Sequence, residues 1–470
     1  MPANPPSLPD ANPVQPGSRD RRTGLMAVAV VALTFLVYNA NGREIGSYDS
    51  QPTKYAAIEL ARHHTLTLDR VMLTTPALVG RHGFTADLEG HVRSAYPVLP
   101  SVIAGGVAAV LQAAHLVDLD APLSPNLTAK VTASLLTALA VAMAFVVARR
   151  RLRPVSAAVV ALGLGLGTNL WALASQTLWQ TETVVAVLAA AAVCLAVPAT
   201  GLTTARLWTA SLLLGLAGAA RPQIAPVIAV LSVSIAVRRR RAGDVLAVLP
   251  ALAIAIATVL LNMHWFGDPL GAAPRLEQLH DSVHGVVGSF GNPLTGAAGL
   301  LLSPSRGLLI FSPIVLIALA GIPVLIREGR SGDLRWWGAA VVAQFALYAS
   351  YSVWWGGHTY GPRYCLDILP LLVPLAAAGF PWVVSRRWSK TLAAAALAWS
   401  ILIAGTGAFV YPFEGWNIMP LEVDVNHGRL WDWRDPQFVR CWRAGWSPSN
   451  FKLFNAGGFR KPARPGVGPT

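Results

Sequence analysis

The sequence predicts an all-α polytopic membrane protein with about 11 transmembrane helices. Of its 470 residues, 54% are hydrophobic and only 13% are charged, whereas a soluble chain carries about 25% charged residues. The mean hydropathy is +0.50. The apolar residues recur in blocks close to the length of a membrane-spanning helix. This pattern excludes a cytosolic enzyme, a disulfide-rich secreted domain and a disordered protein.

Eleven apolar blocks are expected to cross the bilayer. They are 24–40, 128–148, 155–173, 183–198, 207–220, 223–237, 245–263, 307–326, 336–353, 366–384 and 391–410. A twelfth block, 97–116, contains Pro97, Pro100, Gly105 and Gly106, which are typical of a broken re-entrant or interfacial segment.

The basic residues decide whether block 97–116 crosses. If it does not, all the short basic clusters lie in cytoplasmic loops with Arg19, Arg21 and Arg22, as the positive-inside tendency favours. These clusters are 149–153, Arg206, 238–241, Arg327/Arg330/Arg335 and Arg386/Arg387/Lys390. If it does cross, there are twelve spans and these clusters fall outside. We therefore expect eleven spans, in a multi-pass protein of the plasma membrane.

The expected domains follow from this topology. Residues 1–22 read as a disordered cytoplasmic tail, followed by an uncleaved first span rather than a signal peptide. Residues 23–410 form the transmembrane domain, with a long external loop at 41–127, and 411–470 form an external Trp-rich C-terminal segment. The net charge of +14 indicates orientation signals and contact with anionic membrane lipid rather than with nucleic acid.

The three cysteines are too few for a disulfide framework. Cys194 lies within a predicted span and reads as a small hydrophobic residue. Cys365 and Cys441 lie in segments that can share a compartment, so one disulfide is an alternative to the favoured two free thiols.

Two carboxylates lie where the chain leaves the bilayer on the external side. Asp49 follows the first span, and there it fits either a general base or an N-cap for the helix-like segment 52–63. Glu182 opens a span, where the helix dipole favours an anion. The alternative for Glu182 is a catalytic role in one pocket with Asp49.

Cations at the external edge are candidates for holding a phosphate. Arg221, Arg306 and Arg363 each lie beside Gly or Pro, and a tight turn fixes the orientation of a guanidinium. Lys54 is a fourth candidate. The alternative for each is a side chain that extends to the lipid head groups.

Aromatic residues near these charges are candidates for binding a carbohydrate, either a sugar or an acceptor of one, because aromatic rings stack on the faces of sugars. They are Tyr48, Trp179, Trp355 and Tyr360, together with His358. The polar, Trp-rich tail reads either as an interfacial belt or as a small cap with a carbohydrate platform. The histidines show no ligand spacing, so we predict no metal site, although assistance by a divalent cation stays open.

These motifs together resemble the GT-C class of integral-membrane glycosyltransferases, which includes protein O-mannosyltransferases and aminoarabinose transferases. The likeness covers most of 24–410. It rests on Ser47-Tyr48-Asp49-Ser50, on Tyr96-Pro97 before the re-entrant segment, on Glu182 and on Trp354-Trp355-Gly356-Gly357 with Gly361-Pro362-Arg363-Tyr364. Gln180 stands where some bacterial relatives have His, and the tail is shorter than the soluble domain of larger members.

The resemblance implies an activity and its partners. The donor would be a polyprenyl-phosphate sugar, the acceptor a hydroxyl of a glycan, glycolipid or protein, and the active site external. Asp49 would act as base, with inversion at the anomeric carbon, while an arginine stabilises the phosphate. The composition favours mannose or arabinose as the sugar. Alternatives are a membrane transporter or lipid flippase, against which the polar groups on one face argue, and a catalytically silent assembly subunit.

Overall fold

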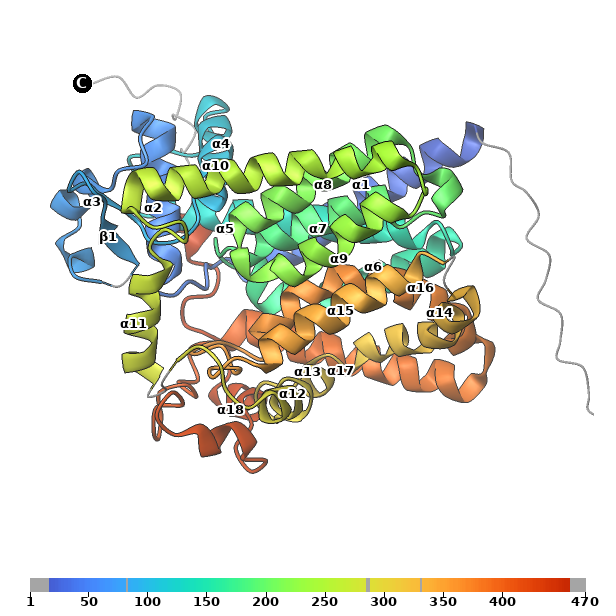
Figure 1. The fold of residues 1–470 in the computed structure, drawn as a ribbon. Coiled ribbons are helices and arrows are strands. Elements are labelled where there is room, and N and C mark those ends of the chain that lie inside the picture. Colours follow the sequence, from blue (N-terminus) through green and yellow to red (C-terminus); the bar gives the residue numbers. More distant parts are fainter. Residues whose placement is uncertain (1–16, 82, 285–287, 330–331, 457–470) are drawn as a thin grey trace, which may run out of the picture.

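The structure is a computed structural model that describes residues 17–81, 83–284, 288–329 and 332–456. Long helices lie side by side and form a bundle that runs horizontally in Figure 1. Shorter elements cover one end of this bundle, at the left of Figure 1. The predicted all-α polytopic fold is confirmed.

Ten helices build most of the bundle. They are α1 (Gly17–Asn39), α5 (Ser124–Ala148), α6 (Pro154–Leu166), α7 (Thr181–Leu195), α8 (Thr204–Ala220), α9 (Ala225–Val237), α10 (Leu249–Phe266), α15 (Leu334–Ala349), α16 (Leu369–Ser385) and α17 (Arg387–Val410). The predicted span 307–326 is divided into α13 (Leu308–Phe311), the 3₁₀ helix η6 (Pro313–Gly321) and α14 (Ile322–Glu328). Each of the eleven predicted blocks thus corresponds to a helix or to a group of short helices.

Five helical segments among the described residues are long and apolar enough to cross a membrane. They are Arg21–Asn39, Ser124–Ala148, Ala242–Phe266, Arg363–Ser385 and Arg387–Val410. Five further apolar helices are shorter, with 10 to 17 residues. The polytopic architecture is therefore clear, and the number eleven stays a prediction.

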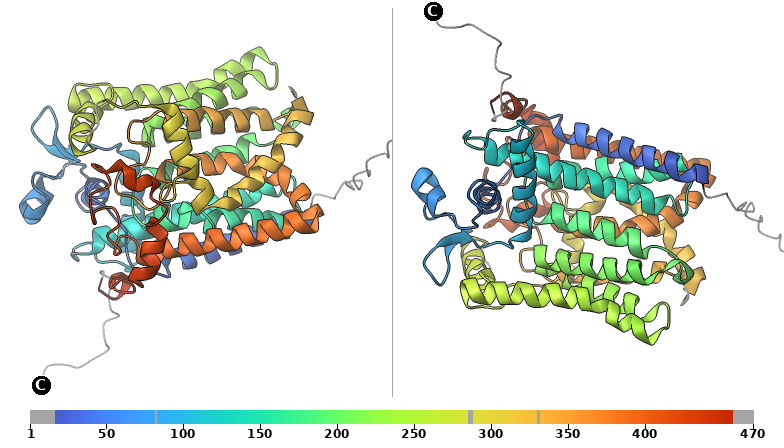
Figure 2. Two further views of the ribbon diagram at one scale, coloured as in Figure 1. Left: turned by 90° about the horizontal axis from the view of Figure 1, so that it is seen from below. Right: turned by 90° about the horizontal axis from the view of Figure 1, so that it is seen from above.

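The first external loop folds into its own small elements. They are α2 (Ser50–His63), α3 (Asp69–Thr74), η1 (Pro76–Leu78), the antiparallel hairpin of β1 (Phe84–Ala86) and β2 (Val92–Ser94), and α4 (Leu99–Ala113). Both α2 and α4 run at a large angle to the bundle in Figures 1 and 2, and they pack against each other. Most of the segment 97–116 thus forms one continuous helix at the end of the bundle, whereas its Pro and Gly residues had led us to expect a broken segment, and its re-entrant or interfacial placement stays a prediction.

Six further elements lie around the same end. They are α11 (Ala273–His284), α12 (Pro293–Leu302), η8 (Arg363–Ile368), η9 (His427–Trp431), α18 (Gln437–Ala444) and α19 (Leu453–Ala456). The C-terminal segment is folded, with Trp416 fully buried. Residues 457–470 of the predicted C-terminal segment lie outside the described residues. All three cysteines are free thiols.

The basic clusters gather at the opposite end of the bundle. The guanidinium of Arg151 lies 2.8 Å from both Glu328 and Asp333, and Arg238 donates to the carbonyl of Leu195. The beginning of α1 lies at this end as well (Figure 1). Residues 17–22, which we expected in the tail, belong to α1, and 1–16 lie outside the described residues.

Small residues allow close approach of helices inside the bundle. A Cβ on Gly215 of α8 would lie 2.9 Å from Cα of Ala251 in α10, and one on Gly321 would lie 2.3 Å from the carbonyl oxygen of Leu375. Helices inside a membrane have no hydrophobic driving force to associate, so close packing of this kind holds them together.

Candidate active site

Asp49 lies immediately before α2, at the end of the bundle that the first loop covers. Its Oδ2 is 3.6 Å from Nη1 of Arg363, and its Oδ1 accepts a hydrogen bond of 3.1 Å from the hydroxyl of Tyr96. Asp49 occupies the N-cap position of α2, as one of the two interpretations expected, but no capping hydrogen bond joins its side chain to the helix. Its side chain is 34% exposed, which leaves the carboxylate accessible.

Tyr96 holds the Asp49 carboxylate from the side of the first loop. Burial, followed by the negative charge of Asp49, raises the pKa of the Tyr96 phenol well above its usual range. The hydroxyl therefore stays protonated and donates to Asp49 at any pH the protein meets. Sequence reasoning quoted Tyr96 as part of a motif and did not include it in the site.

Arg363 comes from the turn 354–364, where three glycines have positive φ: Gly356 (75°), Gly357 (70°) and Gly361 (60°). Its guanidinium carbon lies 4.4 Å from the centre of the Trp179 ring, a distance at which a cation is attracted to an aromatic face. The side chain is 23% exposed. Arg363 is thus oriented by protein on one side and reachable from the other.

Glu182 is fully buried at the start of α7. Its Oε2 accepts the backbone N–H of Trp179 at 3.0 Å, while its Oε1 has no hydrogen-bond partner among the described residues. Both Arg221 and Arg363 act on it electrostatically. Glu182 therefore fixes the segment whose Trp ring supports Arg363.

Arg221 lies behind this layer and is 5% exposed. It donates to Thr181 at 2.8 Å and lies 3.3 Å from Oδ2 of Asp367. Tyr348 donates to the same carboxylate oxygen. The rings of Tyr348 and Tyr364 stack on each other, and their centres lie 5.7 Å and 5.8 Å from the guanidinium carbon of Arg221. Its charge is thus balanced by a buried carboxylate that sequence reasoning did not single out.

Arg306 does not reach the surface. It is fully buried, and it donates to Ser305, Trp355, Gly357, Asn417 and Gln437 through all three guanidinium nitrogens. Burial lowers the pKa of Arg306 to about 10, so it stays charged near neutral pH. This arginine connects the turn 354–364 to the C-terminal segment, and a phosphate has no access to it.

Two other predicted site residues are also enclosed by protein. Lys54 is 2% exposed and binds Glu44 at 3.2 Å and Asn126 at 2.7 Å. Tyr360 is fully buried, and its hydroxyl donates to the carbonyl of Ile403. Both stabilise the fold around the site, and neither offers a surface to a ligand.

Tyr48 is half exposed beside Asp49. The guanidinium carbon of Arg81 lies 4.7 Å from the centre of its ring. Sequence reasoning missed Arg81, although the glycines at 80 and 83 mark a turn around it. A second exposed cation therefore stands next to the Asp49 segment.

Trp355 lines a cavity of about 390 Å³. The lining residues are Asn292, Thr295, Tyr351, Ser352, Trp354, Trp355, His427, Gly428, Leu430 and Trp431. The ring of Tyr351 also contacts that of Tyr364, with centroids 5.6 Å apart, and Tyr364 follows Arg363. An aromatic-lined cavity thus lies beside the turn that carries Arg363.

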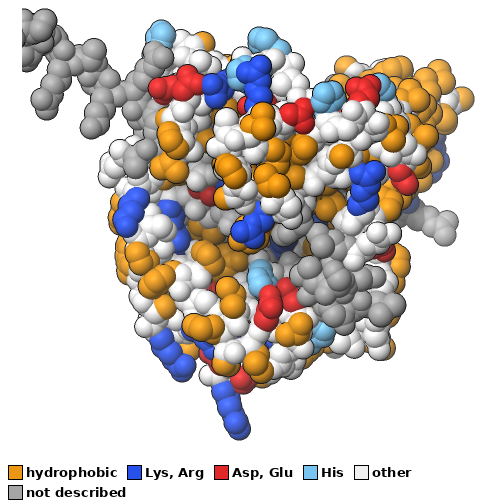
Figure 3. Space-filling model, turned by 90° about the vertical axis from the view of Figure 1, so that its left-hand side faces the viewer, with side chains coloured by type: hydrophobic (Ala, Val, Ile, Leu, Met, Phe, Trp, Pro, Cys, Tyr) orange, Lys and Arg blue, Asp and Glu red, His pale blue; other side chains and the backbone are white. Residues whose placement is uncertain are grey.

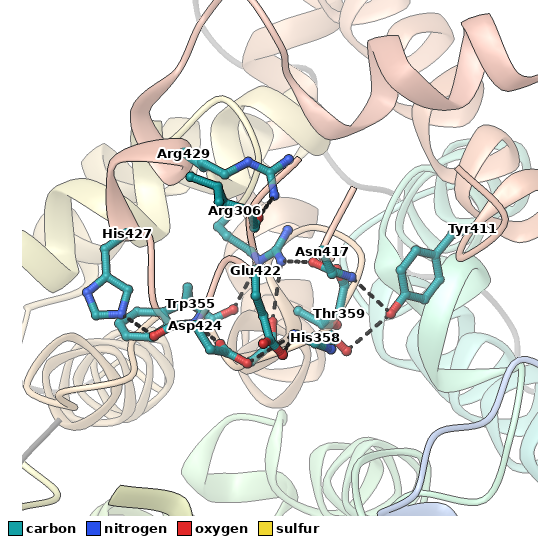
Figure 4. A network of polar contacts seen from close by, with 12 residues as sticks. Arg306, Trp355, His358, Thr359, Tyr411, Asn417, Glu422, Asp424, His427 and Arg429 are labelled. Carbon is teal, nitrogen blue, oxygen red and sulfur yellow. Dashed lines mark hydrogen bonds and ion pairs between the residues drawn. The ribbon is translucent and has the colours of Figure 1, made fainter. Parts of the chain in front are cut away.

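His358, from the same turn, lies between two carboxylates of the C-terminal segment (Figure 4). Its Nε2 is 3.2 Å from Glu422 Oε1 and 3.2 Å from Asp424 Oδ2. Sequence reasoning did not predict this cluster, because its members are far apart along the chain. Figure 3 shows the whole end face, where charged and histidine side chains surround a central depression.

Comparison with known proteins finds similarity in solved structures. No protein-family model and no curated protein matches the sequence. The fold is similar to ArnT from Cupriavidus metallidurans in the apo state, with 14% identity and a TM-score of 0.47, over 94% of this chain and 77% of that one. It is also similar to the archaeal oligosaccharyltransferase AglB from Archaeoglobus fulgidus in complex with an inhibitory peptide and a dolichol-phosphate. That match has 11% identity and a TM-score of 0.49, over 89% of this chain and 61% of AglB.

Proposed function

We propose that this protein is a membrane glycosyltransferase that moves a sugar from a polyprenyl-phosphate donor to an acceptor hydroxyl. The observation that carries the proposal is the pair of Asp49 and Arg363, 3.6 Å apart and both partly exposed. A carboxylate beside an oriented guanidinium offers a proton acceptor and a phosphate-binding group within one site. The basic clusters at the opposite end of the bundle favour an external location of this site.

The reaction needs both groups. The acceptor oxygen attacks the anomeric carbon and its proton passes to Asp49, while the bond between that carbon and the phosphate oxygen breaks and its electron pair stays on the phosphate. Displacement from the opposite face inverts the anomeric centre. General-base assistance contributes about 10²–10⁴-fold, and positive charge at the leaving phosphate stabilises the dianion that forms.

Arg363 is the cation best placed to bind the phosphate. Its guanidinium is partly exposed and stacks on Trp179, whereas Arg221 is buried against Asp367. We assign Arg221 and Glu182 positioning roles, because they act on the segments that hold Arg363 and Trp179. Arg81, beside Tyr48, is a further candidate for contact with the donor.

The acceptor fits the aromatic cavity beside Trp355. Rings of Trp354, Trp355 and Trp431 lie at its wall, and aromatic faces suit the apolar faces of a sugar. Its polar lining from Asn292 and Thr295 offers hydrogen bonds to hydroxyl groups. The cavity is of a size typical of small-molecule sites, and it favours a carbohydrate acceptor.

The test is sugar transfer by membranes that contain the Asp49→Asn variant. Membranes would be supplied with a polyprenyl-phosphate sugar, and envelope glycans would be analysed by mass spectrometry. We expect the variant to fold and to lose transfer by at least about 100-fold. The matched control is Asp120→Asn, since Asp120 is an exposed aspartate of the same loop, paired with Arg62.

Two outcomes would overturn the proposal. If the Asp49→Asn variant transfers sugar at the normal rate, Asp49 is not the general base. Movement of an intact labelled lipid across proteoliposomes, with no sugar transferred by the wild type, would identify a transporter or flippase instead.

A further inference from the structure

We propose that Nε2 of His358 and the carboxylates of Glu422 and Asp424 form a binding site for one divalent transition-metal cation. This site lies outside the group of Asp49 and Arg363, and the inference does not rest on the proposed glycosyl transfer. The ligands come from two separate parts of the chain, the turn 354–364 and the C-terminal segment (Figure 4).

The geometry of the three donor atoms fits a cation. Nε2 of His358 is 3.2 Å from each carboxylate oxygen, and one donor atom from each residue lies within 4.8 Å of the others. Ligands about 2.0–2.2 Å from a metal are about 3.0–3.4 Å apart when they occupy neighbouring positions. Little movement is therefore needed for the three atoms to share an ion.

The ligands are held in place by neighbouring groups. Oδ1 of Asp424 accepts a 2.7 Å hydrogen bond from the indole N–H of Trp355, which leaves Oδ2 directed toward His358. The backbone carbonyl of His358 accepts the hydroxyl of Tyr411 at 3.1 Å. Such secondary contacts orient the ligands of metal sites.

Nε2 of His358 is a buried atom, although the side chain as a whole is 37% exposed. In the described part of the chain, its polar neighbours at 3.2 Å are the oxygens of Glu422 and Asp424. A buried imidazole nitrogen needs a polar partner, and when the imidazole is neutral, a metal ion between it and the two carboxylates supplies that partner. The two carboxylates carry two negative charges, which a divalent cation neutralises.

The ligand set defines the class of cation. One imidazole nitrogen and two carboxylate oxygens suit Mn²⁺, Zn²⁺ or a similar ion. Glu422 is 48% exposed while Asp424 is 2% exposed, so the ion would have one protein-covered side and one side open to water. It would join the C-terminal segment to the turn that continues to Arg363.

The test is metal binding by the full-length protein in detergent after treatment with EDTA. Titration with Mn²⁺ followed by calorimetry and electron paramagnetic resonance should give one saturable site, with coupling of the Mn²⁺ signal to an imidazole nitrogen. The variants His358→Gln and Asp424→Asn should each weaken binding by about 10–100-fold. Because both are close in shape to the original residues, folding is checked by gel filtration and thermal unfolding.

The matched control is His91→Gln. His91 forms an exposed pair with Asp69, with 2.8 Å between Nδ1 and Oδ2. The His91→Gln variant should leave the affinity for Mn²⁺ unchanged. The inference is overturned if wild-type protein shows no saturable site, or if His358→Gln and Asp424→Asn bind Mn²⁺ as the wild type does. Metal binding and sugar transfer are measured on the same variants. A variant that loses one and keeps the other shows that the metal site and the proposed transfer are independent.

Discussion

Oδ2 of Asp49 and Nη1 of Arg363 lie 3.6 Å apart, although the first residue follows α1 and the second precedes α16. Each of the two side chains is also held by a further contact. Tyr96 donates to the same carboxylate, and the Trp179 ring lies under the guanidinium. Four distant segments of the chain thus meet at one partly exposed ion pair, which is the kind of preorganised charge that catalysis at a phosphate requires.

Replacing Arg363 should abolish most transfer. Arg363→Ala removes the charge, and we expect kcat/KM to fall by about 10²–10³-fold, the loss typical of one preorganised contact to developing charge. Arg363→Lys keeps the charge but loses the planar fork and its stacking on Trp179, so its activity should lie between wild type and Arg363→Ala. Steady-state transfer at varied donor concentration measures both.

The control for Arg363 is Arg62→Ala. Arg62 is a partly exposed arginine that pairs with Asp120, and surface pairs of this kind contribute little to stability. It should leave transfer unchanged. Equal rates for Arg363→Ala and Arg62→Ala would contradict a role of Arg363 at the phosphate.

Tyr96→Phe tests whether the orientation of Asp49 matters. The hydroxyl donates to Oδ1 of Asp49 at 3.1 Å, and its removal leaves the ring in place. We expect kcat to fall by about tenfold, which corresponds to about 1.4 kcal/mol, with little change in the KM for donor. An unchanged pH–rate profile together with an unchanged kcat would show that Tyr96 only supports the fold.

The helices could be predicted from the sequence because hydrophobic length is set by the bilayer itself. Every block expected to span became helical. The interruption of 307–326 into α13, η6 and α14 was not predicted, although Pro313 and Pro323 lie within it and proline breaks the helical hydrogen bonds. The interfacial placement of 97–116 stays a prediction, made from its Pro and Gly residues and from the basic clusters.

The site was predictable only in part. Asp49 and Arg363 were identified by their position after spans and in turns, and the structure places them together. Arg306 stands in the same local pattern, yet it is buried by Trp416 and Asn417 of the C-terminal segment. Nothing in the local sequence distinguishes a turn arginine that faces solvent from one that another segment covers.

Arg221 and Asp367 should be energetically coupled. They form a buried ion pair of 3.3 Å, and removal of one partner leaves the other charge without compensation, which costs about 3–5 kcal/mol. Arg221→Gln and Asp367→Asn should each lower thermal stability strongly. The double variant should lose less than the sum, with an interaction energy of about 0.5–3 kcal/mol. Thermal unfolding of the wild type, the two single variants and the double variant in one detergent gives this double-mutant cycle. Strictly additive losses of stability would contradict the coupling.

Gly361→Ala should disturb the turn that carries Arg363. Gly361 has φ +60°, and a Cβ there would lie 2.5 Å from Cδ1 of Phe311 and 2.8 Å from Nδ2 of Asn169. Backbone strain of about 1–2 kcal/mol and overpacking of about 1–3 kcal/mol act together at this position. Both stability and transfer should therefore fall, because Arg363 follows by two residues.

Gly90→Ala separates these two effects. Gly90 in the first loop has φ +89°, and a Cβ there meets no atom within 4 Å, so this variant carries backbone strain without overpacking. It should lower the unfolding temperature less than Gly361→Ala and leave transfer intact. If the two variants behave alike, backbone strain alone accounts for the loss, and contact with Phe311 does not fix the position of the Arg363 turn.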